Sequence, residues 1–295
     1  MARILAIGTA TLDLIFTLSR YPDEDAELRA RGLRISPGGN AANTLIVLSQ
    51  LGHTCAFGCV LADGHEATPI LEHLARHQID LTACRRVPGR PPTSCVLLSL
   101  EGGSRTIVHY RDLPEYTDDD FQHIDLIPFD WVHFEARDGS ETTRMIRRIR
   151  ESRLDLPCSV EVEKPRPGIE AVFAGATLLI FSRAYAGHHE FDTPHPFLLR
   201  MREQALQADL IVTWGNEGAY GLDRRRAIHH SPAYPPIEVK DTLGAGDTFN
   251  AGLIDAYIRG LGMAEALPHA CRLAGNKCGQ IGLEGLGGDI ATKPG

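Results

Sequence analysis

The chain has 295 residues, of which 43% are hydrophobic and 23% are charged, and this composition excludes collagen, coiled coils and disordered chains. Lys and Arg number 30 and Asp and Glu number 38, and the resulting net charge of -8 disfavours a nucleic-acid partner. The longest uncharged apolar stretch, residues 171–182, is far shorter than the roughly 20 residues that cross a bilayer, so we expect no membrane partner.

Predicted strands and helices alternate along the chain. Short apolar runs that suit strands buried on both faces are Ile4–Ile7, Trp131–Phe134, Cys158–Val162, Thr177–Phe181 and Leu210–Thr213. Stretches with helical periodicity are Ala41–Leu51, Glu66–Gln78, Glu141–Arg153, Pro196–Gln207, Thr248–Arg259 and Ala264–Cys278. Such strands separated by helices predict an α/β fold, a doubly wound and mostly parallel sheet flanked by helices.

Two further segments predict a smaller sheet. Thr93–Leu100 and Arg105–Tyr110 are separated by Glu101-Gly102-Gly103-Ser104, which indicates a β-hairpin with a glycine turn. Glu27–Ile35 alternates in polarity and could join the hairpin. We expect one domain over residues 1–295, with a small sheet from about 14–36 and 93–112 projecting from it.

A glycine-containing segment near the C-terminus carries the strongest chemical signal. Asp241–Phe249 reads Asp-Thr-Leu-Gly-Ala-Gly-Asp-Thr-Phe and runs into a predicted helix. Its glycines allow close backbone approach, and the helix start offers free N–H groups, so the segment predicts an anion-binding loop. Phe249 replaces the third glycine of a dinucleotide fingerprint, and the Gly-Lys of a Walker A loop is absent, so neither class of site fits.

Asp247 lies beside this anion-binding loop. A carboxylate there would repel a phosphate unless it has another task, such as accepting a proton from an attacking hydroxyl. An Asp at a helix start can also simply cap the helix. The residues alone leave both interpretations open.

A second glycine-containing helix start lies near the N-terminus, at Pro37–Asn43. Asn40 and Asn43 are three residues apart, so both amides project from one face of the predicted helix and could bind a polyol. Asn40 could equally be a helix cap. A cap does not explain Asn43, because it lies one turn inside the predicted helix, where Asn has a low helix propensity.

Other candidates carry weaker signals. Asp13, flanked by Leu and Ile, is either a structural acid or a ligand for hydroxyl groups. Trp214–Gly218 is either a plain turn or a place where a flat base approaches the backbone. His73 and His77 are four residues apart but do not form the H-E-x-x-H zinc pattern, which disfavours a metal site there. The seven cysteines form no C-x-x-C pair and predict reduced thiols in a cytoplasmic protein.

Together, Gly38–Asn43 and Asp241–Phe249 resemble the two signatures of the ribokinase-like (PfkB) carbohydrate kinases, and the similarity covers nearly the whole chain. The segments that resemble the family's ketohexokinase branch, which phosphorylates fructose at O1, are Tyr21–Asp25, Gly103–Ile107, Val160–Arg166 and Gly275–Gly279. The resemblance implies an ATP-dependent sugar kinase. Alternative acceptors within the family are ribose, a nucleoside, another ketose or keto-deoxy-gluconate, and a non-catalytic sugar or nucleotide sensor is a less favoured alternative.

The resemblance also implies roles for individual residues. Asp247 would be the catalytic base, and Gly244, Ala245 and Gly246 would form the anion hole. The sugar-binding residues would be Asp13, Gly39, Asn40 and Asn43. The residues that would bind the nucleotide or its phosphates are Arg105, Arg183, Trp214, Gly215, Asn216, Gly218, Gly244, Gly246, Asn276 and Cys278. The projecting sheet would be a lid through which two copies form a homodimer.

The implied metals are Mg²⁺ and, near Asp241, a monovalent cation such as K⁺. Many family members organise Mg²⁺ through an N-x-x-E segment, but residues 181–186 here contain neither residue. The organising residues therefore stay open, with Glu163 as the candidate and Glu161 and Lys164 nearby. In two further departures, Arg183 stands where the ketohexokinase branch has Lys, and Asn216 replaces an acidic residue.

Overall fold

The computed structural model describes residues 1–102 and 104–288, and its centre is a mixed sheet with strand order β14-β13-β12-β11-β10-β9-β1-β4. The parallel strands are β1 (Arg3–Ile7), β4 (Thr54–Gly58), β9 (Trp131–Glu135), β10 (Cys158–Val162), β11 (Leu178–Ser182) and β12 (Asp209–Thr213). β13 (Ala219–Leu222) and β14 (Ile228–Ser231) extend it antiparallel at one edge. The predicted α/β fold with a mostly parallel sheet is confirmed.

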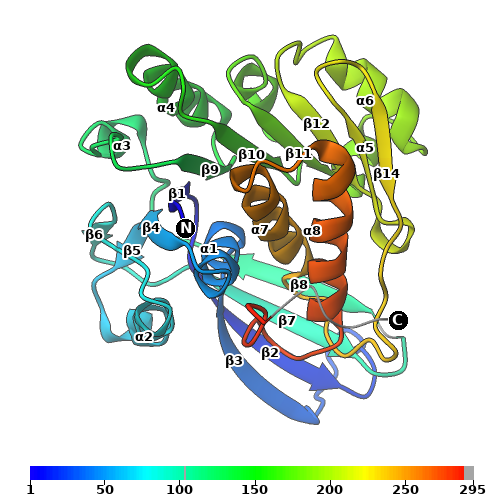
Figure 1. Ribbon diagram of the computed structural model, residues 1–295. Coiled ribbons are helices and arrows are strands. Elements are labelled where there is room, and N and C mark those ends of the chain that lie inside the picture. The colour runs from blue at the N-terminus through cyan, green and yellow to red at the C-terminus, as the bar shows by residue number, and fades with distance from the viewer. Residues whose placement is uncertain (103, 289–295) are drawn as a thin grey trace.

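Helices cover both faces of this sheet because successive residues of each strand point to opposite sides. In β1, Ile4 and Ala6 enter the core beneath α1 (Asn40–Gln50), α7 (Ala245–Ile258) and α8 (Met263–Cys278), which lie side by side in Figure 1. The helices of the opposite face are α4 (Gly139–Ser152), α5 (Arg183–His188) and α6 (Pro194–Arg202). Each predicted helix is present, with ends shifted by a few residues.

A separate four-stranded sheet has the order β3-β2-β7-β8. Its strands are β2 (Thr11–Leu18), β3 (Gly32–Gly38), β7 (Thr93–Ser99) and β8 (Arg105–Tyr110). The predicted hairpin is therefore present, although Gly103 of its turn lies outside the described residues. Because β1 leads through Gly8–Ala10 directly into β2, this sheet begins where the parallel strands end. The arrangement places it beneath the central sheet in Figure 1.

The remaining elements are short. They are β5 (Val60–Ala62), β6 (Arg85–Val87), α2 (Thr68–Arg76), α3 (Asp118–Phe121) and the 3₁₀ turns His65–Ala67, Ile169–Val172 and Gly215–Glu217. α2 packs Ile70 and Leu74 into the same core as α1 and α7. Among the described residues, none of the helices combines the length and hydropathy needed to span a bilayer.

Candidate active site

A polar cavity of about 560 Å³ opens at the carboxyl ends of the parallel strands, where ligands bind in open α/β sheets. One wall is the inner face of the small sheet, and the opposite wall is the start of α7. Predicted site residues from five separate parts of the chain line it: Asp13, Gly39, Asn40, Asn43, Arg105, Glu163, Gly244, Gly246 and Asp247. The fold thus brings together residues more than two hundred positions apart.

The start of α7 is shaped by Gly244 and by the turn that precedes it. Gly244 has φ 83°, a left-handed conformation that favours glycine. Asp241 accepts hydrogen bonds from the N–H groups of Leu243 at 2.9 Å and Gly282 at 3.3 Å, which fixes the turn. The first N–H groups of a helix have no intrahelical acceptor, so those at Gly246 and Asp247 face the cavity as donors for an anion.

Asp247 is almost fully buried, at 6% exposure, on the cavity side of α7. Its Oδ2 accepts a hydrogen bond of 2.7 Å from the Asn43 amide on α1. Burial raises the pKa of Asp247 to about 8, the nearby carboxylates of Glu135 and Glu163 also raise it, and the Asn43 bond opposes this shift. A carboxylate with such a pKa is a better proton acceptor near neutral pH than an ordinary Asp.

A cluster of carboxylates lies around Asp247. Glu161 on β10 is buried, and its Oε1 accepts a bond of 3.3 Å from the Asn40 amide, while Glu163 accepts from the same amide at 3.4 Å. Burial and the neighbouring carboxylates raise the pKa of Glu161 well above its ordinary value, and its Oε2 has no hydrogen-bond partner among the described residues. A buried, unpartnered carboxylate oxygen in an acidic cluster fits a divalent cation bound to oxygen ligands.

Glu135 on β9 has a different part in the same cluster. Its Oε2 accepts from the backbone N–H of Thr9 at 3.1 Å and Ala41 at 3.4 Å, and Arg137 pairs with Oε1 at 3.3 Å. These bonds hold the end of β1 against the start of α1. Gly39, just before α1, has φ 106°, and a Cβ there would lie 2.0 Å from the Thr9 carbonyl oxygen, so only glycine fits.

The small sheet contributes a row of polar side chains. The register pairs Asp13 of β2 with Ser94 of β7, and Ser94 with His109 of β8, so all three face the cavity. Ser94 Oγ lies 3.2 Å from His109 Nδ1, and Thr11 Oγ1 donates to Asp13 at 3.1 Å. Burial raises the pKa of Asp13. The row offers both donors and an acceptor to a polyhydroxylated ligand.

Arg105 of β8 connects the small sheet to the anion-binding loop. Its guanidinium donates to Thr242 Oγ1 at 3.0 Å, directly beside the start of α7. It thereby brings a positive charge from the small sheet to the place where an anion would sit.

Asp241 already has cationic partners. The buried Lys277 ammonium lies 3.2 Å from its Oδ2 and 2.8 Å from its backbone oxygen, and Arg34 lies 3.5 Å from Oδ2. The atoms of Asp241 that would hold a monovalent cation are thus taken by Lys277. These residues do not fit such an ion, and we assign K⁺ no part in the reaction.

A second, mostly apolar cavity of about 390 Å³ adjoins the first, since Thr213, Thr242 and Gly246 line both. The predicted nucleotide-binding residues that line it are Gly215, Asn216, Gly218, Gly246 and Cys278, together with Ala245. Pro235, Pro236 and Ala274 supply apolar walls suited to a flat ring. The start of α7 therefore stands between a polar cavity and an apolar one.

Other predicted nucleotide-binding residues lie outside the two linings. Trp214 is buried at 2% exposure beneath Arg183, whose guanidinium lies 5.2 Å from the indole ring. Arg183 also pairs with Glu217 at 3.8 Å, and Asn276 is exposed on α8. Arg183 thus contacts residues on both sides of the turn at Gly215.

Sequence reasoning missed Glu135, Ser94, His109 and Arg137 as cavity residues. Their neighbours in sequence are apolar strand residues or a loop, and only the strand register carries them to the cavity. Glu135 offered one signal, an acidic residue at the end of an apolar strand.

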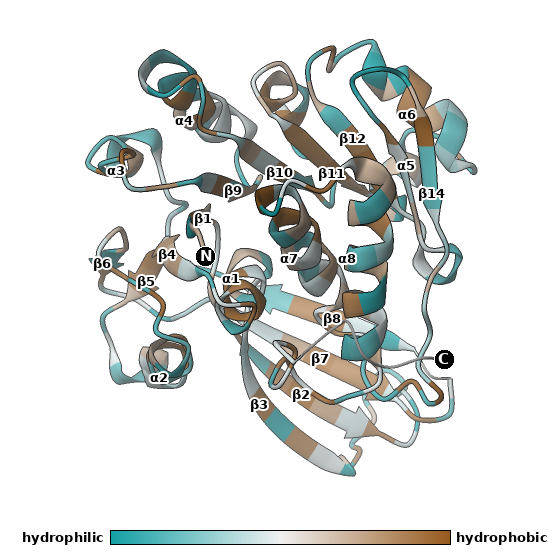
Figure 2. Ribbon diagram, in the orientation of Figure 1, coloured by the Kyte–Doolittle hydropathy of each residue, from teal (hydrophilic) through white to brown (hydrophobic). Residues whose placement is uncertain are grey.

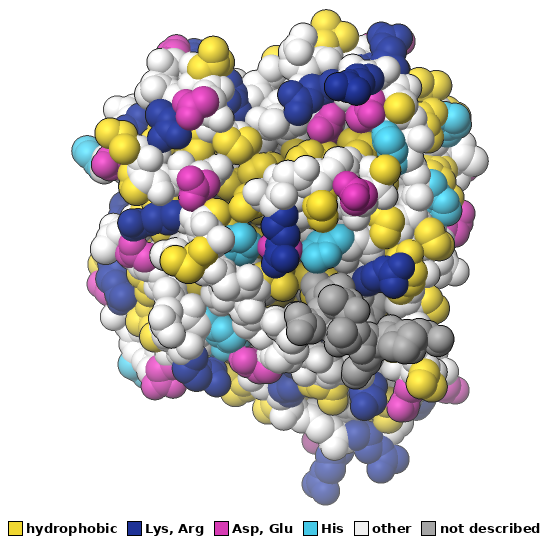
Figure 3. Space-filling model, viewed as in Figure 1, with side chains coloured by type: hydrophobic (Ala, Val, Ile, Leu, Met, Phe, Trp, Pro, Cys, Tyr) yellow, Lys and Arg dark blue, Asp and Glu magenta, His cyan; other side chains and the backbone are white. Residues whose placement is uncertain are grey.

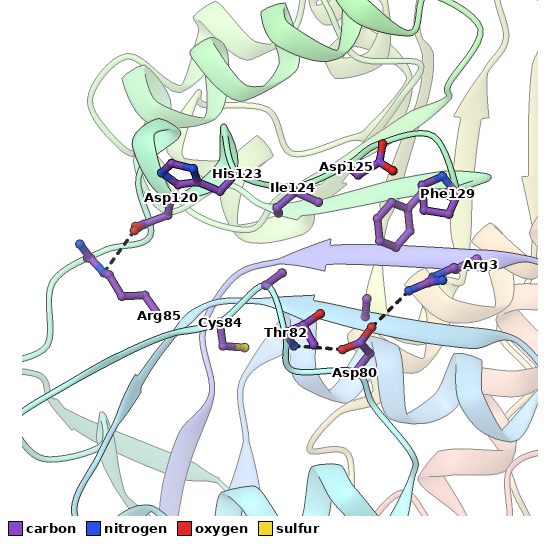
Figure 4. Close-up of a pocket in the computed structure, with 13 residues that line it drawn as sticks. Arg3, Asp80, Thr82, Cys84, Arg85, Asp120, His123, Ile124, Asp125 and Phe129 are labelled. Carbon is purple, nitrogen blue, oxygen red and sulfur yellow. Dashed lines mark hydrogen bonds and ion pairs between the residues drawn. The ribbon is translucent and has the colours of Figure 1, made fainter.

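A third cavity, of about 510 Å³, lies away from the site (Figure 4). Arg3 at the start of β1 lines it, so it adjoins the opposite end of the strand. Arg3 pairs with Asp80 at 3.2 Å and Arg85 with Asp120 at 3.3 Å, so both arginines of the cavity are already paired with carboxylates. We assign it no ligand.

Comparisons with known proteins show that this chain is similar to carbohydrate kinases in both sequence and fold. The sequence pattern of the pfkB family carbohydrate kinases matches residues 1–285. Ketohexokinase of Mus musculus is 38% identical over 293 residues, 96% of this chain and 98% of that protein, and ribokinase of Bacillus subtilis is 25% identical over 97% and 96%. The fold is similar to that of Arabidopsis thaliana ribokinase complexed with ribose and ATP, with a TM-score of 0.80, 19% identity, and coverage of 95% of this chain and 94% of that one.

Proposed function

The chain belongs to the pfkB family of carbohydrate kinases, and we propose that it transfers the γ-phosphoryl group of ATP to O1 of D-fructose. One juxtaposition carries this proposal: the N–H groups at the start of α7 and the Asp247 carboxylate lie where the polar cavity meets the apolar one. A sugar in the first cavity and a nucleotide in the second would meet at that point. The identity to a ketohexokinase supports fructose as the sugar.

Asp247 is the base of the proposed reaction. Its carboxylate takes the proton of the sugar hydroxyl as the hydroxyl oxygen bonds to the γ-phosphorus and the bond to the β-γ bridging oxygen breaks, which releases ADP. The Asn43 amide, 2.7 Å from Oδ2, orients the carboxylate. The N–H groups at the start of α7 stabilise the charge on the transferring group.

The polar row of the small sheet and the two asparagines bind the sugar. Asp13, Asn40, Ser94 and His109 present hydrogen-bonding groups to one cavity, with Gly39 allowing close approach of the backbone. We treat the small sheet as a lid, and Arg105 as the residue that reaches from it to the phosphates. Such a lid excludes water from the transfer.

Mg²⁺ fits the carboxylates of Glu161 and Glu163, because one buried oxygen of Glu161 lacks a protein partner. When bound, Mg²⁺ neutralises the phosphate oxygens of ATP. Between ATP binding events, Asn40 keeps these two carboxylates in place through its amide.

Two other features of the chain bear on its assembly and its compartment. The outer face of the small sheet exposes Leu33, Ile35, Val108 and Tyr110, and we infer a homodimer through this face. Figure 2 shows hydrophobic residues along β2, β3 and β7 of this sheet. Basic and acidic side chains are interspersed over the face seen in Figure 3. The seven cysteines are free thiols, which supports a cytoplasmic enzyme.

Sugar-dependent ADP release from Mg-ATP tests the proposal. We expect the highest kcat/KM with fructose in a panel that includes other ketoses, ribose, adenosine and keto-deoxy-gluconate. Phosphorus NMR of the product should place the phosphate on O1. Preference for a non-ketose would refute fructose as the substrate but keep the family chemistry, and sugar binding without turnover would refute the kinase activity.

A further inference from the structure

A cluster of metal-ligating side chains lies outside the active site, where α2 meets the C-terminal segment 279–288. His73 and His77 are one helical turn apart, and Glu284 comes from the C-terminal segment. One ligand atom of each residue lies within 4.8 Å of the other two. The His73–His77 spacing alone disfavoured a metal site, but folding adds a third ligand from 207 residues away.

The cluster is partly fixed without any ion. The His77 side chain is only 9% exposed, and its Nε2 lies 3.2 Å from Glu284 Oε1. The two imidazole rings are 5.2 Å apart in an edge-to-face arrangement.

The segment that carries Glu284 is anchored to α1 on both sides of that residue. The Gln50 side chain donates to the Leu283 carbonyl oxygen at 2.8 Å and accepts from the Leu286 N–H at 3.1 Å. Glu284 is thus held beside α2, while its side chain, 63% exposed, is free to rotate toward an ion.

We propose that His73, His77 and Glu284 form a binding site for Zn²⁺. Two imidazole nitrogens and one carboxylate are a donor set that zinc takes, with water in the remaining position, whereas Mg²⁺ and Ca²⁺ prefer oxygen ligands. Donors at bond lengths of about 2.0–2.2 Å around a tetrahedral ion lie roughly 3.4 Å apart. Side-chain rotations suffice to bring donors within 4.8 Å to that spacing.

The positive charge of Arg76 lies beside the proposed zinc ligands. Its guanidinium donates to His73 Nδ1 at 3.2 Å, and its side chain is exposed, so it can turn away into solvent. The positive charge of Arg76 weakens binding of a cation nearby. Removing that charge while keeping the ligands should therefore tighten the site.

A bound ion would tie the C-terminal segment to α2. The same segment reaches the anion-binding loop, because the Gly282 N–H donates to Asp241 Oδ2 at 3.3 Å. His73, Arg76 and Glu284 also line a cavity of about 230 Å³ that they share with Asp13 and Asn43. Zinc would therefore restrain a wall next to the sugar cavity.

The test is a Zn²⁺ titration of the full chain, without an affinity tag and stripped of metals, against a chelating dye in Mg²⁺-free buffer. We expect one site, weakened at least about tenfold by Glu284→Gln and by His73→Gln, and tightened by Arg76→Gln. His188→Gln, which changes a histidine of α5, is the matched control and should leave the affinity unchanged. His77→Gln is a poorer probe, because a buried side chain is altered.

Hydrogen exchange gives a second readout that does not depend on activity. Zinc should slow amide exchange in residues 280–286 of the wild type and not in Glu284→Gln. The proposal is overturned if no saturable zinc binding occurs, or if Glu284→Gln and His73→Gln bind zinc as tightly as the wild type. Exchange that zinc slows equally in Glu284→Gln would overturn it as well.

Discussion

At the scale of single residues, the position of Asp247 gives the sharpest prediction. Its carboxylate lies beside an anion-binding helix start and has a pKa of about 8. Asp247→Asn keeps the size of the side chain but removes the proton acceptor. We expect kcat to fall on the order of 10²-fold or more while fructose binding persists, measured by ADP release and by calorimetry. Retained turnover would contradict the assignment of Asp247 as base.

The same substitution should stabilise the fold in a pH-dependent way. The Asp247 pKa is about 8 in the folded chain against an ordinary 3.8, so burial of the charge destabilises the native state increasingly as pH rises from 3.8 to 8. Asp247→Asn removes this penalty. Its melting temperature should exceed that of the wild type at pH 8.5 by several degrees, about 2–4 °C for each kcal/mol, with the difference vanishing near pH 4. If the melting temperature of Asp247→Asn at pH 8.5 is equal to or lower than that of the wild type, the charge of Asp247 does not destabilise the native state.

Asn43 acts through Asp247 and has a different signature. The hydrogen bond from its amide lowers the pKa of Asp247, so Asn43→Ala should raise that pKa. The acidic limb of the pH profile of kcat/KM should then move to higher pH. Asn216→Ala, in the apolar cavity, is the control and should change the KM for ATP without moving the limb. If the acidic limb does not move in Asn43→Ala, Asn43 does not set the pKa of Asp247 and its proposed role is sugar binding alone.

At the scale of elements, local sequence patterns predicted the strands and helices whose apolar residues follow a regular period. The apolar run Cys158–Val162 is β10 to the residue, and the 93–110 hairpin is β7 and β8. β4, β13 and β14 were not predicted: β4 ends in glycine, β13 is short and contains glycine, and β14 carries His229 and His230, so none has a clear periodicity. β4 and β14 are the two edge strands and β13 lies next to β14. These places follow from tertiary packing, which a local pattern does not contain.

Near its C-terminal end, α7, the helix that carries Asp247, is held in place by Asp255. This fully buried carboxylate accepts hydrogen bonds from His53 and His269 at 2.9 Å and from Arg259 at 2.8 Å. Burial alone would raise the pKa of Asp255, but the bonds from His269, His53 and Arg259 outweigh it and lower the pKa below 3.8. The associated stability is present above pH 3.8 and is lost as the pH falls below that value.

Asp255→Asn should therefore cost about 3 kcal/mol of unfolding free energy at neutral pH, because it removes the buried carboxylate that His53, His269 and Arg259 all contact. Urea unfolding measures this cost, and it should shrink below pH 3.8. The matched control is Asp223→Asn, whose partner His229 lies 3.1 Å away in a more exposed pair, and its cost should stay below about 1 kcal/mol. Equal costs at the two positions would show that Asp255 does not fasten α7.

At the scale of the whole molecule, the site was predictable where one motif held its residues and not where it depends on strand register. Asp247 and the α7 glycines share one motif, and Asn40 and Asn43 share another. His109 and Ser94 reach Asp13 only because β2, β7 and β8 pair in one register. The contact between Lys277 and Asp241 was likewise not predictable from a local pattern, since 36 residues separate the two along the chain.

The assembly is the last property that the fold constrains. Alternation along β8 places Arg105, Ile107 and His109 toward the sugar cavity. Val108 and Tyr110 are left on the outer face, 62% and 58% exposed. Apolar side chains grouped on one sheet face are stabilised when a second copy covers them, so we expect the wild type to elute from size-exclusion chromatography with light scattering at twice the chain mass.

Val108→Glu should shift that mass to one chain, because a dimer would bury two carboxylates close to the symmetry axis or against apolar side chains. Leu206→Glu is the matched control, since Leu206 is also 62% exposed but precedes β12, away from the small sheet, and it should leave the dimer intact. A single-chain mass for the wild type at all concentrations would refute the dimer. Dissociation by Leu206→Glu and not by Val108→Glu would move the interface to the helical side of the molecule. Because the inner face of the same sheet lines the cavity that we propose for the sugar, the monomeric Val108→Glu variant should also show a raised KM for fructose.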